Sequence, residues 1–117
     1  MSGPRVPPRS YSTEPEAFGK AEIIAWIDAS SSAEVDRIEA AKLQHAYAVR
    51  IKRRIHAQNM TVHDYAVMTG RPYDRLTKIL RGDATMTLRD VAQAERVLKG
   101  IVTGETPSRS IPRETLD

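Results

Sequence analysis

The chain has 117 residues, of which 40% are apolar and 28% charged, with a formal net charge of +3 and no cysteine. This length suits one domain with tails. The lack of cysteine excludes disulfides and thiolate zinc sites. No apolar run reaches the roughly 18 residues of a membrane span, and the N-terminus lacks a signal-peptide core, so we expect a cytoplasmic protein.

The two ends of the chain differ from its middle in composition. Residues 1–12 and 101–117 are rich in proline and polar residues and cannot bury enough apolar surface to offset their ordering entropy. We therefore expect a flexible arm at 1–12, a helical domain at 13–100 and a flexible tail at 101–117. Within the helical domain, residues 33–100 hold 13 Lys and Arg against 8 Asp and Glu, and this excess of positive charge favours a polyanionic partner.

The spacing of apolar residues predicts an all-α fold, because the helical period recurs and no segment alternates over the length of a strand. The first helix is predicted over residues 13–29, where Thr13 can cap and Glu16 can reach back to it. Its large apolar side chains include Phe18, Ile24, Trp26 and Ile27. They can complete the core of the domain, join two copies as a homodimer, or do both, since Trp and Phe are favoured at interfaces.

A long second helix is predicted from Ala33 to Gln58, with Ser31 and Glu34 as its capping pair. Its core stripe is expected to consist of Val35, Ile38, Leu43, Tyr47, Ile51 and Ile55. Its last third is basic, and these cations either bind DNA phosphates or simply suit the negative end of the helix dipole.

Two short helices follow, Thr61 to Thr69 and Tyr73 to Arg81, joined by a turn that contains Gly70 and Pro72. Neither is long enough to bury its apolar side alone, so neighbouring helices must hold them at a steep angle. Capping boxes are predicted at Thr61 with Asp64 and at Thr87 with Asp90. The second box opens a last helix that ends at Gly100, with an inward face of Leu88, Val91, Ala94 and Leu98.

The helix at 73–81 has two chemically different sides. Leu76, Ile79 and Leu80 share one side and should face the core. The other side carries the candidate base-reading residues Tyr73, Asp74, Thr77 and Lys78. Lys78 can donate to guanine and Asp74 can accept from cytosine, whereas the Tyr73 ring and the Thr77 methyl can contact a thymine methyl.

A second group of residues is expected to contact DNA phosphates, which position a protein without reading sequence. This group consists of Arg71, Arg75, Arg81, Arg50, Arg53, Arg54 and His63. An N-terminal arm containing Arg5 and Arg9 can add further contacts of the same kind.

Residues 46–99 resemble the lambda-repressor-like (Cro/repressor, XRE-type) helix-turn-helix family. The resemblance is carried by Ile51, Thr61, Tyr65-Ala66, Gly70, Leu76, Ile79, Gly82 and the helix that Thr87 begins. It implies a compact domain of about five helices, no catalysis, and dimeric binding to a palindromic operator. It also implies that Tyr73, Asp74 and Lys78 face the bases, with Thr77 beside them. The N-terminal helix and half of the long helix are additions to that pattern.

The chain departs from the family pattern at several positions. Val62 stands where a phosphate-binding glutamine is common, with His63 beside it as a substitute, and Pro72 stands where Ser or Thr usually caps the second helix. A buried Arg–Glu pair of the family is replaced by Ile55 and Leu80. Such a swap is often neutral or stabilising, so we expect these two residues to touch.

An enzyme is not expected, because no nucleophile, phosphate-loop or metal-binding pattern occurs, and no cofactor is implied. The three histidines are interpreted as solvent-facing polar residues. The sequence predicts a sequence-specific transcriptional regulator that binds double-stranded DNA, a repressor of bacterial or phage type. The alternative is a protein-interaction module, antitoxin-like or an adaptor, that uses the same helices on a protein partner.

Overall fold

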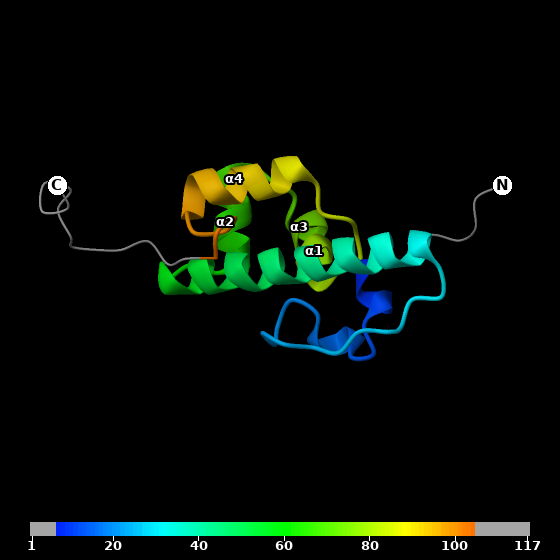
Figure 1. The fold of residues 1–117 in the computed structure, drawn as a ribbon. Helices are drawn as coiled ribbons and strands as arrows, with labels where there is room; N and C mark the ends of the chain where they lie inside the picture. Colours follow the sequence, from blue (N-terminus) through cyan, green and yellow to red (C-terminus); the bar gives the residue numbers. More distant parts are fainter. Residues whose placement is uncertain (1–6, 105–117) are drawn as a thin grey trace, which may run out of the picture.

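The computed structural model describes residues 7–104, which form an all-α fold as predicted (Figure 1). The elements are the 3-10 helices η1 (Pro8–Tyr11) and η2 (Pro15–Ala17) and the α-helices α1 (Ser32–Ala57), α2 (Val62–Thr69), α3 (Tyr73–Arg81) and α4 (Leu88–Leu98). Within these residues, no helix is long and apolar enough to cross a membrane. Arg5 lies outside the described residues, and so do residues 105–117, which make up most of the predicted tail.

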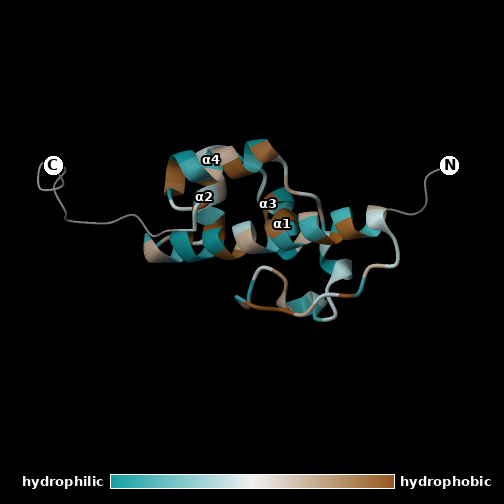
Figure 2. Ribbon diagram, in the orientation of Figure 1, coloured by the Kyte–Doolittle hydropathy of each residue, from teal (hydrophilic) through white to brown (hydrophobic). Residues whose placement is uncertain are grey.

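Helix α1 runs along the whole domain and carries the other elements on two sides. In Figure 1, α2 and α4 lie above α1, and the N-terminal residues 7–29, which we call the strap, lie below it. Apolar and hydrophilic turns alternate along α1, as expected for a helix that is covered on two sides (Figure 2). The predicted bounds of α1 are confirmed to within one residue, and the Ser31 hydroxyl caps it by accepting from the Glu34 N–H.

Two residues of the predicted stripe on α1 were placed wrongly, because Val35 and Leu43 are exposed. Leu43 comes five residues after Ile38, a spacing that turns it away from the buried side of a helix. The stripe instead passes through small and polar residues, which are Ala41, Gln44, His45, Ala48 and Val49.

The predicted α-helix over residues 13–29 is wrong. The strap contains only the two short 3-10 helices, and an isolated antiparallel bridge joins Ser12 to Trp26. Polar side chains take the backbone groups that a helix would need, since the Ser12 hydroxyl donates to the Ala25 carbonyl (2.7 Å) and the Glu14 carboxylate accepts from the Ala25 N–H (2.6 Å). The described end of the predicted arm is likewise packed, because Tyr11 is buried.

The main core lies between α1 and helices α2 to α4. Its largest buried side chains include Tyr65, Ile55, Leu98 and Ile101. Ile55 and Leu80 both belong to this cluster and are each 2% exposed, in keeping with an aliphatic replacement of a buried ion pair. Ile101 is fully buried, so the predicted tail does not begin at that residue.

A smaller cluster joins the strap to the N-terminal half of α1. It consists of Tyr11, Ile38 and Ala41, with Trp26 and Ile27 packed against it. The strap therefore contributes its own apolar residues to the folded domain.

Candidate nucleic-acid interface

The segment from α2 to α3 is fixed by local hydrogen bonds. Both predicted capping boxes are confirmed, at Thr61 with Asp64 and at Thr87 with Asp90. Helix α2 ends at Gly70, whose φ of 71° is accessible to glycine with little strain, and the next N–H, that of Arg71, returns to the Ala66 carbonyl (2.9 Å). Pro72 starts α3 without a side-chain cap, since its fixed φ of −61° already suits a helix start.

Helix α3 buries one side and exposes the other, as its sequence predicts. Leu76, Ile79 and Leu80 are buried. We call the opposite side, made of Tyr73, Asp74, Thr77 and Lys78, the reading face. The Tyr73 side chain is 46% exposed and its ring lies 5.5 Å from that of His63 on α2. Thr77 is partly buried, and its hydroxyl donates to the Asp74 carbonyl (2.9 Å).

The end of α3 is held by groups that the sequence did not reveal. The side-chain amide of Gln44 donates to the carbonyls of Ile79 and Ala84 (both 2.9 Å) and accepts from the Met86 N–H (2.9 Å). The only sequence signal for this role is a glutamine within the apolar stripe of α1. On the other side of the same end, the Arg9 N–H of the strap donates to the Gly82 carbonyl (3.0 Å).

Arg71, which the sequence analysis assigned to DNA phosphates, forms an ion pair and a hydrogen bond with residues of α4. Its guanidinium is paired with the buried carboxylate of Asp90 and also donates to Gln93 (2.6 Å). Burial tends to raise the pKa of Asp90, but hydrogen bonds from the Thr87 N–H and from Arg71 outweigh it, so that pKa lies below its ordinary value. The ion pair joins the start of α3 to α4.

Changing Asp90 to Asn should lower the free energy of unfolding at neutral pH by about 1–3 kcal/mol, because the largely buried guanidinium of Arg71 loses its charged partner. A lowered pKa means that this stability is present above pH 4 or so and is lost as the pH falls through the folded-state pKa. Urea unfolding across pH should therefore show the wild-type and Asp90→Asn curves converging in acid. The exposed Asp74→Asn change is the control, and a constant gap between the wild-type and Asp90→Asn curves would contradict the ion pair.

The basic end of α1 serves mainly to fasten the C-terminal part of the described chain. Arg50 donates to the carbonyls of Ile101 (2.8 Å) and Val102 (3.1 Å), and Arg54 donates to the Leu98 carbonyl (3.2 Å). Arg50 and Arg54 therefore have a structural role, which is hydrogen bonding to these distant carbonyls and differs from the helix-dipole role that the sequence suggested.

The remaining cations are more accessible. Arg53 pairs with Glu22 of the strap (2.6 Å) and keeps most of its side chain in solvent. On α3, Arg75 is half exposed and lies 4.0 Å from the Asp90 carboxylate. Arg81 pairs with Asp83 (3.2 Å), which also pairs with Arg9 (3.0 Å). His63 is exposed on α2 beside Tyr73.

The proposed homodimer interface is contradicted for two of its four residues. Phe18 is 1% exposed and Ile24 is also buried inside the chain, so neither is available to a second copy. Trp26 and Ile27 are partly buried against the smaller cluster. The alternative, in which these side chains complete the core, describes the fold.

The interpretation of all three histidines as solvent-facing is wrong for His45. Its ring is buried, its Nδ1 accepts from the Gly19 N–H (2.9 Å), and it packs edge-on against Phe18 and Trp26. A nitrogen that accepts carries no proton, so the Nε2 atom is protonated and faces the Glu22 carbonyl (3.3 Å). His45 thereby joins the strap to α1.

Comparison with known proteins gave no match, whether to a protein-family model, a curated protein or a solved structure. The resemblance to the lambda-repressor-like family therefore stays a prediction. Within residues 7–104, no group of three or more His, Cys, Asp or Glu side chains is arranged to hold a metal ion.

Proposed function

We propose that this protein is a sequence-specific DNA-binding transcriptional regulator that places α3 in a major groove. The observation that carries the proposal is the division of α3 into a buried aliphatic side and an exposed reading face. The strap packs at the Gly82 end of α3, and Tyr73, Asp74 and Lys78 remain exposed. A helix-turn-helix protein needs this arrangement, since its second helix must both anchor in the core and present polar groups to base edges.

Each member of the reading face has a chemical use against DNA. Lys78 can donate to guanine O6 and N7, and Asp74 can accept from cytosine N4. The Tyr73 ring and the methyl group of Thr77 suit a thymine methyl group. The preferred site should therefore combine a G·C pair with neighbouring thymine.

The phosphate contacts that we propose are fewer than the sequence suggested. Arg75, Arg81 and His63 flank the reading face and are exposed. Arg71, Arg50 and Arg54 are left out, because each is partly buried and also bonded to a partner within the chain. Affinity should accordingly rest on a small number of phosphates, with a correspondingly modest dependence on salt.

A repressor of bacterial or phage type would bind as two copies, with half-sites about one helical turn apart. Phe18 and Ile24 are excluded as the joining surface, since both are buried within the chain. The spacing of selected half-sites and sedimentation of the protein with and without DNA would establish the stoichiometry.

Changing Lys78 to Ala should weaken binding to the preferred DNA site by about 1–3 kcal/mol and relax the preference at one base pair. The site is first selected from random duplexes, and binding is then measured over a range of salt concentrations. Lys42→Ala is the matched control, because Lys42 is an exposed lysine on α1 that pairs with Glu39.

The outcome separates three interpretations. An equal loss on every sequence would assign Lys78 to a phosphate. A protein that binds no duplex at any salt concentration would contradict the proposal and favour the protein-interaction module. A DNA-binding protein should instead show a log–log salt slope of about −0.9 for each phosphate that it neutralises.

A further inference from the structure

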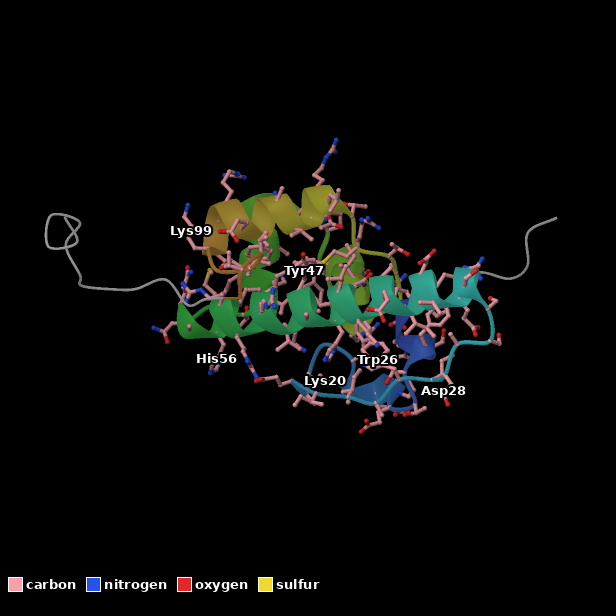
Figure 3. All side chains as sticks on the ribbon, in the orientation of Figure 1. Lys20, Trp26, Asp28, Tyr47, His56 and Lys99 are labelled. Carbon is pink, nitrogen blue, oxygen red and sulfur yellow. The ribbon has the colours of Figure 1, made fainter. Side chains whose placement is uncertain are left out.

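A positively charged hollow, separate from the reading face, lies where the strap crosses α1. A hollow of about 380 Å³ is lined by Lys20 of the strap and by Lys52, Arg53 and His56 of α1, with Gly19 and Val49 also in its wall. None of its lining residues comes from α2, α3 or α4. Figure 3 shows Lys20 and His56 on the same side of α1, opposite Tyr47.

The charges around this hollow are poorly balanced. Glu22 pairs with Arg53 (2.6 Å) and so offsets one of the three cations. Burial and then the nearby charge of Lys20 lower the pKa of Lys52, which means that its ammonium is held in an unfavourable environment. An anion in the hollow would offset the cost of desolvating the Lys52 ammonium and reduce its repulsion from Lys20.

We propose that this hollow binds a phosphate-bearing anion, either free phosphate or the phosphate group of a small organic molecule. Lys20, Lys52 and His56 line it from two separate segments, and a phosphate has enough acceptor oxygens to bond the donor groups of all three. Its volume lies within the range of small-molecule sites, so a phosphate with a small organic part can also fit.

Occupation of the hollow should fasten the strap to α1. The strap is already held at this point by the bond from the Gly19 N–H to His45, and Gly19 lies against the Leu80 carbonyl at the end of α3. A bound anion would add a bridge between Lys20 and Lys52 and thereby stabilise the folded protein. This site does not depend on the proposed DNA-binding function.

The test is a titration of the full chain with inorganic phosphate against chloride at constant ionic strength. Phosphate should raise the melting temperature and shift the NMR amide signals of residues 19–22 and 49–57. Lys20→Met and Lys52→Met should each weaken phosphate binding by about threefold to tenfold. Lys52→Met should also melt at a higher temperature than wild type without phosphate, because it removes a poorly solvated charge.

Lys42→Met is the control, since Lys42 lies on α1 but outside the hollow, and it should respond to phosphate as the wild type does. An equal effect of phosphate and chloride, or a phosphate effect that both hollow variants retain, would overturn the proposal. A DNA salt slope that falls by about one in Lys52→Met, with no response to free phosphate, would replace it by a DNA backbone contact. The Lys78→Ala experiment tests DNA recognition independently of these results.

Discussion

Replacing Leu80 with Glu should leave the domain largely unfolded at room temperature. Leu80 is 2% exposed within the main core, and its counterpart on α1 is the aliphatic Ile55, so a new carboxylate would be buried without a cation. A buried charge without a partner costs several kcal/mol, a large part of the 5–15 kcal/mol that stabilises a typical domain. Circular dichroism and urea unfolding would measure the loss.

The control for Leu80→Glu is Lys78→Glu, two residues earlier on the same helix and exposed. It introduces the same side chain into α3 but should change the melting temperature little, because the new charge stays in water. A Leu80→Glu protein as stable as Lys78→Glu would contradict the packing of α3 against α1.

Changing Gly19 to Ala should destabilise the protein by about 2–5 kcal/mol. Gly19 has a φ of +73°, a conformation that costs a residue with a Cβ about 1–2 kcal/mol. Its Cβ would also lie 2.1 Å from the Leu80 carbonyl oxygen, and this backbone atom cannot move without displacing the end of α3. Overpacking of this kind adds about 1–3 kcal/mol.

Gly70→Ala separates the two causes of that loss. Gly70 has a similar φ of +71°, but nothing lies within 4 Å of the position that its Cβ would take. The Gly70→Ala variant should lose about 1–2 kcal/mol of stability, which is the cost of the left-handed backbone conformation alone. Trp26, which packs against Phe18 and His45, should change its fluorescence in Gly19→Ala alone. Equal destabilisation of the two variants would show that the strap does not approach α3 closely.

The parts of the fold that could be predicted are those that short-range signals specify. The capping boxes of α2 and α4 use hydrogen bonds between residues three apart, and Gly70 and Gly82 end their helices in the left-handed conformation. The sequence of the strap contains no such short-range signals, because the conformation of the strap depends on contacts with residues far along the chain. The bond from Gly19 to His45 spans 26 residues, and no periodicity in the sequence encodes it.

The candidate site divides in the same way. The reading face follows from helical spacing alone, and Tyr73, Asp74 and Lys78 are exposed as predicted, whereas Thr77 is partly buried. The phosphate contacts stay a prediction, and the sequence alone does not distinguish a cation that has a distant partner within the chain from a free one. Arg71 pairs with Asp90 on another helix, and Arg50 bonds a carbonyl 51 residues away. Leu88 was expected inside the core but is 85% exposed, because the apolar period of α4 begins only after its capping box.

The Gln44 amide also fixes the orientation of α3. Sliding or tilting α3 along α1 would break the hydrogen bonds from Gln44 to the Ile79 and Ala84 carbonyls, so this side chain holds the inclination of the helix. Under the proposed function, substitutions at Tyr73, Asp74 or Lys78 would alter DNA specificity without changing the angle at which α3 meets the DNA.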